Sequence, residues 1–335
     1  MSESIMKKNL LVIGLGSIGE RHLRCFKNLG DVQVAGCEMN VELGEKIAKR
    51  YDCPVYPSLD EALRAQTFDA GVVCTLANTH IPITKQCVEA GLHVLIEKPL
   101  AVSRDGVEEL EKLAAARERI LRVAYVHRSM TLFLAGKKIL DSGRIGQPRH
   151  ASLVAGQHFP TCRPAYREIY YTSHERGGGC IQDAITHSVH TMEWMMGDIK
   201  SLFTSAEHQV LEGVEVEDTV NMVATTLDGT MLSLAFNQFQ APNEVFLQIN
   251  GTKGSLRFDL SKSRVGVLLL GDENWTWEEF PVNGRDDFFQ NQARYFIDTL
   301  AGEETPLATL AEAEQTLRVN IASLESARTH REITL

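Results

Sequence analysis

Short apolar segments alternate with amphipathic ones over the first 125 residues of the chain. The largely apolar segments are 9–13, 31–38, 70–75, 93–96 and 121–126. Their length and composition are typical of strands buried on both faces of a sheet. Helical periodicity lies between them, as at 79–90 and 103–118. This alternation predicts an α/β fold with a doubly wound parallel sheet, whose ligands should bind beyond the carboxyl ends of the strands.

The pattern changes after residue 126. The elements expected there are a helix at 130–141, a strand at 149–158, a long loop at 159–179, hairpins around Asp228-Gly229 and 250–254, and helices at 286–301 and 308–328. We therefore expect two domains. An α/β domain should occupy residues 1–126, and an α+β domain with a large open, mostly antiparallel sheet should occupy residues 127–335.

A helix after the long loop combines an apolar face with an unusual polar one. Its apolar face carries Ile181, Ile185, Val189, Met192 and Met196. Its other face carries Asp183, His187, His190 and Trp194. Asp183 and His187 are four residues apart, about one helical turn, so an acid and an imidazole share one face. The glycines at 177–179 allow another group to approach the start of the helix closely. A solvated face with a core histidine is the alternative.

The first apolar segment runs directly into Gly14-Leu15-Gly16-Ser17-Ile18-Gly19. In this pattern Gly14 permits a tight turn, Gly16 allows close approach of a pyrophosphate, and Gly19 allows the helix to pack against the strand. The helix that begins at Ser17 and Ile18 supplies free N–H groups for the phosphates. The segment predicts a dinucleotide site.

Glu38 ends the second predicted strand, 19 residues after Gly19. A carboxylate at this position accepts hydrogen bonds from the ribose hydroxyls of the adenosine. It also repels a 2′-phosphate, and Met39 and Asn40 supply no cation to offset that repulsion. The sequence therefore predicts NAD rather than NADP.

Residues that follow the other predicted strands should lie at the same rim of the sheet. We assign to the cofactor, besides the glycine segment and Glu38, the residues Thr75, Asn78, His80, Glu97 and Lys98. Lys98 can also donate to a substrate oxygen, although an exposed Glu–Lys pair is the alternative. Asn78 and His80 could instead cap the helix that follows them.

The loop before the Asp183 helix is rich in aromatic and basic side chains. They are Phe159, Arg163, Tyr166, Arg167, Tyr170, Tyr171, His174 and Arg176. Such residues suit a sugar or an anionic polyol, and they are equally common at subunit interfaces. The residues expected to contact substrate are His127, Arg128, His158, Arg163, Tyr166, Arg167, Asp183 and His187. No third ligand accompanies His187 and His190, so no metal is expected.

Composition narrows the class of partner. The 335-residue chain has a net charge of −10, which argues against nucleic acid and against anionic membrane surfaces. No apolar stretch reaches membrane-spanning length. Seven scattered cysteines and the absence of an apolar leader in the first eight residues favour the cytoplasm.

These motifs together resemble the glucose–fructose oxidoreductase/inositol dehydrogenase family (Gfo/Idh/MocA). The resemblance rests on residues 14–19, Asn78 with His80, residues 90–100 with Glu97-Lys98-Pro99, and residues 177–179 followed by Asp183, His187, Trp194 and Gly197. It implies a Rossmann domain, a second domain whose open sheet often mediates homodimers or homotetramers, and hydride transfer between a sugar or polyol carbon and nicotinamide.

By motif, Lys98, Asp183 and His187 match the catalytic group of that family. His187 would act as general base or acid, Asp183 would orient the reacting hydroxyl or the imidazole, and Lys98 would stabilise the alkoxide. His190 stands where many relatives carry an acid and Val126 where many carry asparagine, so an exact substrate cannot be carried over.

Two other functions stay open. Some members of the family use tightly held NAD for a transient sugar oxidation that cleaves a glycoside, and an NAD-dependent glycosidase is therefore the alternative. A catalytically silent NAD-sensing or assembly protein is the third, against which the intact Lys98, Asp183 and His187 argue.

Overall fold

The computed structural model describes residues 7–282 and 284–335. The chain divides into two compact units, Met1–Ser129 with Gly284–Ala311, and Met130–Asn283 with Glu312–Leu335. The sequence analysis placed a single boundary after residue 126, whereas the structure returns to the first unit late in the chain. Most of the first eight residues, in which no apolar leader is expected, lie outside the described residues.

The first unit contains a seven-stranded sheet in the order β15-β6-β5-β4-β1-β2-β3. Its strands are β1 (Lys8–Ile13), β2 (Val32–Cys37), β3 (Val55–Tyr56), β4 (Ala70–Val73), β5 (His93–Ile96), β6 (Leu121–Val123) and β15 (Ala308–Thr309). All neighbours pair in parallel except β15, which is antiparallel to β6. The predicted parallel sheet is confirmed. The strand order reverses between β1 and β4, and a crevice for ligands is expected where this happens.

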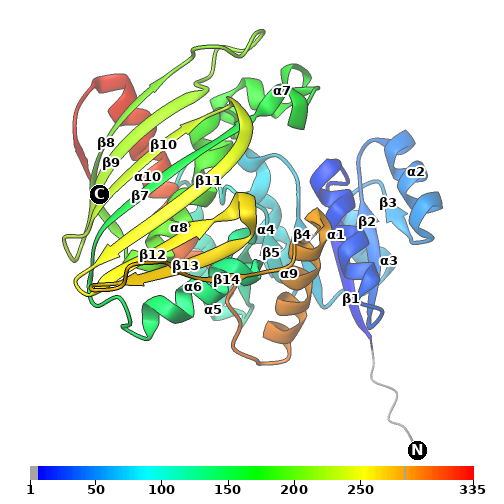
Figure 1. The fold of residues 1–335 in the computed structure, drawn as a ribbon. Coiled ribbons are helices and arrows are strands. Elements are labelled where there is room, and N and C mark those ends of the chain that lie inside the picture. Colours follow the sequence, from blue (N-terminus) through cyan, green and yellow to red (C-terminus); the bar gives the residue numbers. More distant parts are fainter. Residues whose placement is uncertain (1–6, 283) are drawn as a thin grey trace, which may run out of the picture. The chain divides into compact units, whose positions relative to one another are not determined.

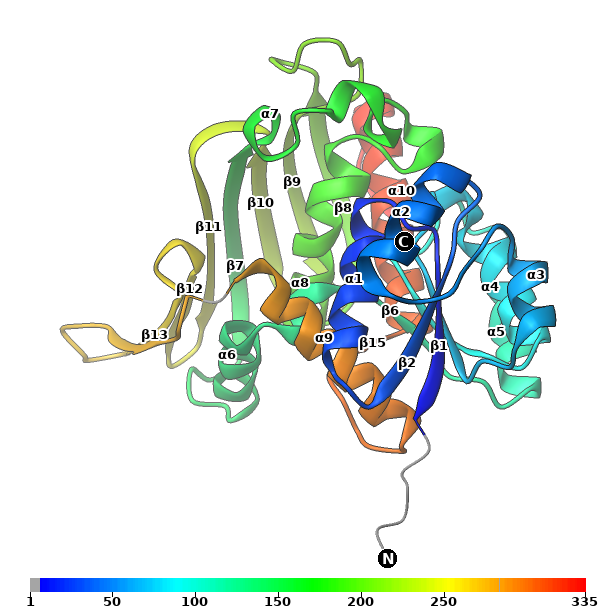
Figure 2. The ribbon, with the colours of Figure 1, turned by 90° about the vertical axis from the view of Figure 1, so that its right-hand side faces the viewer.

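Helices cover both faces of this sheet (Figure 2). They are α1 (Ser17–Asn28), α2 (Val41–Tyr51), α3 (Leu59–Ala65), α4 (His80–Glu89), α5 (Val107–Ala116) and α9 (Arg285–Leu300). The late segment joins the unit because α9 packs on α1, where Phe296 meets Phe26 edge to face at 6.2 Å. In addition, Ala308 of β15 pairs with Val123 of β6.

The second unit contains a nine-stranded sheet in the order β14-β13-β12-β11-β7-β10-β9-β8-β16 (Figure 1). Its strands are β7 (Pro148–His158), β8 (Ile199–Glu207), β9 (Thr219–Thr226), β10 (Met231–Asn237), β11 (Phe239–Gly251), β12 (Gly254–Asp259), β13 (Arg264–Leu269), β14 (Thr276–Glu279) and β16 (Ile333–Thr334). Among these described strands β7 and β10 pair in parallel, and the other neighbours pair antiparallel.

Both predicted hairpins are confirmed, β9 with β10 and β11 with β12. The sequence pattern did not predict β8, β13, β14 or β16. The residues of β14 and β16 are mostly exposed or half-buried at the two edges of the sheet, so they carry no apolar face that a pattern could reveal.

Helices α6 (Thr131–Asp141), α8 (Thr186–Met196) and α10 (Leu310–Thr329) cover one face of this sheet (Figure 2). Short turns of helix fill the loop before α8: α7 (Phe159–Cys162), η3 (Tyr166–Glu168), η4 (Tyr170–Thr172), η5 (His174–Arg176) and the π-helix η6 (Ile181–Ile185). Another short turn, η7 (Leu260–Lys262), follows β12.

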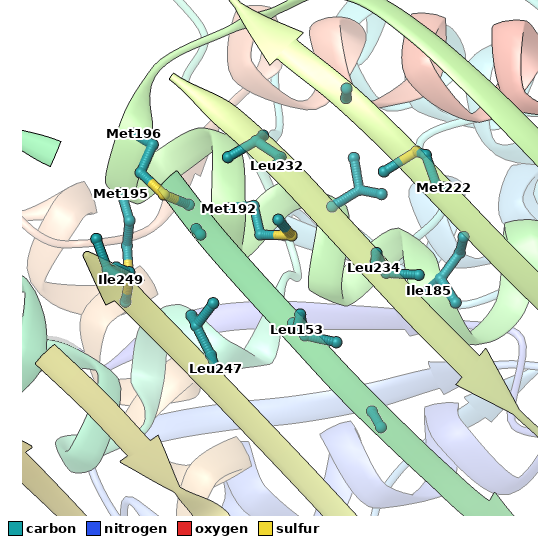
Figure 3. Packing of buried hydrophobic residues seen from close by; sticks show 14 of the residues in the cluster. Leu153, Ile185, Met192, Met195, Met196, Met222, Leu232, Leu234, Leu247 and Ile249 are labelled. Carbon is teal, nitrogen blue, oxygen red and sulfur yellow. The ribbon is translucent and has the colours of Figure 1, made fainter. Parts of the chain in front are cut away.

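The core of the second unit lies between α8 and the sheet. Met192, Met195 and Met196 belong to one buried apolar cluster with Leu153 and Leu247 of the central strands (Figure 3). All five apolar residues predicted for the inner face of this helix are buried, as expected. Burial continues onto the other side of α8, however, where His190 and Glu193 are also buried. His187 and Trp194 are half-buried, so the predicted polar face is not a fully solvated one.

A search of the helices in the described part of the chain finds none that is both long and apolar enough to cross a bilayer.

Candidate functional site

The glycine loop joins β1 to α1 in the first unit. Gly14 has φ +85°, and a Cβ there would lie 3.0 Å from the backbone oxygen of Cys74. A Cβ on Gly19 would lie 1.8 Å from the backbone oxygen of Gly14, so only glycine lets the helix pack this closely. Around Gly16 no atom lies within 4 Å of the Cβ position. The start of α1 at Ser17 and Ile18 thus adjoins open space of the kind a pyrophosphate needs.

Glu38 lies directly beside this loop. Its Oε2 accepts the N–H of Leu15 at 2.8 Å, and its Oε1 accepts the N–H of Asn40 at 2.9 Å. Asn40 caps α2 by accepting the N–H of Leu43 at 3.0 Å. The carboxylate is therefore fixed at the carboxyl end of β2, and each oxygen keeps a lone pair for another donor.

The residues that follow β4 divide into two groups. Asn78 is exposed, and Thr75 accepts the hydroxyl of Thr79 at 2.8 Å. His80 is buried, with Nδ1 3.0 Å from the oxygen of Pro99 and Nε2 3.2 Å from the oxygen of Thr75. Burial lowers the pKa of His80, so the neutral ring donates to one of these carbonyls. This geometry favours a role in joining two loops over the direct cofactor contact expected from the sequence.

Glu97 is buried beneath Lys98 and is not part of an exposed ion pair. Its Oε1 lies 2.7 Å from Nε2 of His22 on α1, and its Oε2 accepts the backbone N–H of Lys98 at 2.9 Å. Burial alone would raise the pKa of Glu97, but the His22 hydrogen bond and the Lys98 charge outweigh it and lower that pKa. The carboxylate stays ionised and holds the backbone of Lys98 in place.

His127 and Arg128 follow β6. Burial and then the nearby Lys98 ammonium lower the pKa of His127 to about 4, so its ring is neutral at physiological pH. Arg128 is 5% exposed, and its guanidinium donates to the oxygen of Pro306 at 3.3 Å. Arg128 therefore braces the segment before β15, a role that the sequence did not indicate.

In the second unit, Asp183 sits inside the π-helix η6. A π-turn contains one more residue than an α-turn, and such turns are frequent at functional sites. Asp183 is 6% exposed and accepts the hydroxyl of Tyr170 at 2.7 Å. His187 follows on α8 and is half-buried. The structure thus brings a loop tyrosine onto the acid that the sequence singled out.

The glycines at 177–179 allow close approach of another group, and in the structure other residues of the same chain approach them. A Cβ on Gly178 would lie 2.3 Å from the backbone oxygen of Tyr171. On Gly179 a Cβ would lie 2.7 Å from both carboxylate oxygens of Glu217. These glycines therefore let the loop and Glu217 pack against the start of η6.

Glu217 connects the loop to the helix that carries Asp183. Its Oε1 accepts the N–H of Ile181 at 2.8 Å, and its Oε2 lies 2.5 Å from Nε2 of His174. Its backbone oxygen accepts the N–H of Cys180 at 3.0 Å. The hydrogen bond to Glu217 raises the pKa of His174 in spite of partial burial.

The loop aromatics divide between core and site. Phe159, Tyr166 and Tyr171 form a small buried cluster, and the Tyr166 hydroxyl donates to the oxygen of Glu212 at 2.7 Å. This burial favours a packing role for Tyr166 over the substrate contact expected from the sequence. The hydroxyl of Tyr171 donates to Gln238.

The remaining expected substrate residues of this region differ in exposure and in the hydrogen bonds that they make. The guanidinium of Arg167 donates to the backbone oxygen of Glu212 at 2.7 Å and to its carboxylate at 3.2 Å. His158 lies at the end of β7, with Nδ1 2.7 Å from the Thr161 hydroxyl. Arg163 is half-buried and Arg176 is exposed.

Sequence reasoning missed three residues that hold the candidate site together: His22, Tyr170 as the partner of Asp183, and Glu217. Tyr170 stood in the aromatic loop, but nothing marked it among its neighbours. His22 and Glu217 act on residues 75 and 36 positions away, so no local motif could reveal them. Among the described residues, no three His, Cys, Asp or Glu side chains gather where they could hold a metal ion.

Comparisons with known proteins cover both units. A family model described as "Oxidoreductase family, NAD-binding Rossmann fold" matches residues 8–125, and one described as "GFO/IDH/MocA C-terminal domain" matches residues 133–257. The inositol 2-dehydrogenase of Pseudomonas savastanoi pv. phaseolicola is 30% identical over 198 residues, which are 58% of this chain and 56% of that protein. The inositol 2-dehydrogenase of Azotobacter vinelandii is 28% identical over 88% of this chain and 86% of that protein.

Solved structures share the fold. A levoglucosan dehydrogenase in complex with NADH and levoglucosan superposes with a TM-score of 0.86 at 18% sequence identity, covering 98% of this chain and 99% of that one.

The His174–Glu217 pair predicts a pH-dependent stability. A raised folded pKa gives stability that is present below the unfolded value and is lost as the pH rises through the folded value. We expect His174→Gln to lower the free energy of unfolding by about 1 kcal/mol or less at pH 6, because half of His174 is exposed. At pH 9 the difference should vanish. Urea unfolding at both pH values measures it, with the exposed His150→Gln as control. An equal loss at both pH values would contradict the assignment.

Proposed function

Because the chain belongs to the Gfo/Idh/MocA oxidoreductase family, we propose that it transfers a hydride between a sugar or polyol hydroxyl carbon and nicotinamide. The observation that carries this proposal is that one chain holds both a dinucleotide loop, in its first unit, and Asp183 with His187 on consecutive helical turns, in its second unit. Relatives named for inositol and a structural neighbour named for levoglucosan support this substrate class. NAD, when bound, supplies the hydride acceptor.

The residues of the first unit fit NAD. The open surroundings of Gly16 and the start of α1 suit the pyrophosphate. The fixed carboxylate of Glu38 suits the ribose hydroxyls and disfavours a 2′-phosphate. Lys98, held through Glu97, would lie at the nicotinamide end of the site, since it follows β5.

The proton chemistry is assigned to three side chains. His187 takes the proton of the reacting hydroxyl during oxidation and returns it during reduction. Asp183, anchored by Tyr170, orients the hydroxyl or the imidazole. Lys98 stabilises the charge that develops on the oxygen. The neutral His127 beside Lys98 adds no second positive charge there.

We also propose a homo-oligomer formed through the open sheet. The face of this sheet away from the core exposes apolar side chains, among them Val154, Val223 and Met231, which are 53%, 57% and 63% exposed. Val154 and Val223 line one hollow of this face together with Phe203. Exposed apolar surface of this kind is typical of protein–protein contacts.

Replacing Glu38 tests the cofactor assignment. We expect Glu38→Ala to weaken NAD binding about tenfold or more, because charge-assisted hydrogen bonds are lost, and to narrow the preference for NAD over NADP. Titration of both cofactors by fluorescence measures this. Glu38→Gln keeps an acceptor oxygen and should lose less NAD affinity. Tighter binding of NADP than of NAD by the wild type would overturn the assignment.

Lys98→Met and His187→Ala test the catalytic assignment. Each should lower kcat about 100-fold or more while NAD affinity stays nearly unchanged, because each removes a group that acts on the reacting oxygen. Steady-state kinetics and NAD titration separate the two effects. Turnover close to that of the wild type would remove the substituted residue from the mechanism.

The substrate class is tested with a panel of neutral and acidic sugars, polyols and glycosides. We expect NADH to form in proportion to product; aglycone release without NADH accumulation would instead identify an NAD-dependent glycosidase. If an acidic substrate is preferred, Arg163→Ala should raise its KM about tenfold or more. Arg167→Ala is the matched control, because Glu212 already holds that guanidinium. Equal KM values in wild type and both variants would end the anion hypothesis for these arginines.

A further inference from the structure

A buried histidine on α1 makes a hydrogen bond that packing does not require. His22 is 0% exposed, and its Nε2 lies 2.7 Å from Oε1 of Glu97. Its Nδ1 is buried and has no hydrogen-bond partner in the described part of the chain. The ring centroids of Phe289 and Phe26 lie 5.4 Å and 6.4 Å from that of His22. A leucine would fill this space without leaving a buried nitrogen unpaired, so the histidine needs another explanation.

The partner of His22 is a buried carboxylate that holds the backbone of Lys98. Glu97 is 5% exposed, and its Oε2 accepts the N–H of Lys98 at 2.9 Å. The backbone beyond the lysine is also held, because the oxygen of Pro99 lies 3.0 Å from Nδ1 of His80. The position of Lys98 at the rim of the sheet therefore depends on an acceptor oxygen of Glu97.

Glu97 supports Lys98 fully only when its carboxyl group is ionised. A carboxylate accepts with both oxygens, so one can bind His22 while the other binds Lys98. Nε2 of His22 is then the donor. A protonated carboxyl group instead needs an acceptor for its own hydrogen, and it no longer attracts the nearby Lys98 ammonium. Protonation of Glu97 would therefore weaken both the backbone support and the electrostatic support of the lysine.

The surroundings of Glu97 make His22 important for its charge. Burial raises the pKa of Glu97, but the interactions with His22, followed by the charge and the N–H of Lys98, outweigh burial and lower it. The titratable and charged groups around this carboxyl are His22 on α1, Cys74 after β4, His80 on α4 and Lys98, with His127 beyond Lys98. Burial raises the pKa of Cys74 and lowers that of His80, so neither supplies a charge. Without His22, the pKa of Glu97 would rise.

We propose that His22 is a positioning residue for Lys98, because its donation to Glu97 keeps that carboxylate as the acceptor that holds the lysine backbone. The proposal deepens the proposed function and rests on it for the task of Lys98 at the reacting oxygen. Helix α1 would thus serve the cofactor site twice, with its first turn at the pyrophosphate and with His22 at the nicotinamide end.

The first test reads the support of Lys98 without catalysis. In protein labelled with nitrogen-15 lysine, the amide of Lys98, assigned with Lys98→Arg, should be protected from hydrogen exchange. His22→Asn, whose amide is too short to reach Glu97, should reduce this protection about tenfold or more. His22→Gln should retain it, because its amide can place an N–H where Nε2 of His22 lies. Equal protection in the wild type and His22→Asn would overturn the proposal.

The second test measures catalysis with the polyol that the panel identifies. His22→Asn should lower kcat about tenfold, as expected for one lost hydrogen bond, while KM and NAD affinity stay nearly unchanged. His22→Gln should stay near wild type. The control on the same helix is Arg24→Gln, whose guanidinium pairs with Asp286 and not with Glu97. An equal fall of kcat in Arg24→Gln would mark general damage to α1 and overturn the proposal.

The third test uses the charge of Glu97. The lost hydrogen bond raises the pKa of Glu97 in His22→Asn, so lowering the pH from 8 to 6 should protonate it in that variant. The kcat of His22→Asn relative to wild type should therefore fall further at pH 6, and His187, present in both proteins, cancels in this ratio. Infrared spectra at pH 6 should show a protonated carboxyl band that His22→Asn/Glu97→Gln lacks. A constant ratio without this band would overturn the role of His22.

The positioning role and the proposed function can fail separately. If the Lys98 amide and the Glu97 carboxyl group respond as expected in a protein that oxidises no polyol, the positioning role stands and the proposed function is refuted. If a polyol is oxidised with equal kcat by the wild type and His22→Asn, the positioning role is refuted and the proposed function stands.

Discussion

In the second unit, the arrangement of the long loop and of the π-helix η6 depends on the position of the Glu217 carboxylate. This side chain binds the N–H of Ile181 and the ring of His174, while its backbone oxygen binds the N–H of Cys180. One residue just before β9 thereby fixes both the end of the long loop and the beginning of the π-helix. Asp183 and its partner Tyr170 come from these two segments, so their 2.7 Å contact follows from that anchor. Any larger residue at Gly179 would occupy the place of the carboxylate.

The first unit obeys a different constraint, the close packing of α1 against the loop after β1. Because Gly19 has no side chain, the start of α1 can lie against the glycine loop. Glu38, which directly follows β2, accepts the N–H of Leu15 in the same loop. The buried His22 on α1 then reaches Glu97 beneath Lys98. The close packing of α1 against the loop after β1 therefore also places His22 beside Glu97, and Glu97 holds the backbone of Lys98.

Sequence patterns were informative wherever the determinant is local. Each parallel strand, the glycine loop and the apolar face of the Asp183 helix is encoded in a short continuous segment, and Glu38 directly follows one of these strands. The pattern carries no signal for partners that lie far away in the sequence. It did not reveal that Tyr166 and Arg167 bond to Glu212, or that Arg128 bonds to Pro306. The π-turn at Asp183 is held by Glu217, which lies 36 positions from Ile181 in the sequence. No periodicity within the helix could reveal this partner.

The late return of residues 284–311 to the first unit has a consequence for synthesis of the chain. When a ribosome has released residues up to Ser129, the sheet still lacks β15 and α1 still lacks the α9 helix that covers it. The apolar surface of Phe26 then stays without its partner Phe296 until almost the whole polypeptide has emerged. The second unit also waits, because α10 and β16 lie in its last segment, Glu312–Leu335. Each half of the molecule is thus completed by a segment that is encoded after the bulk of both halves.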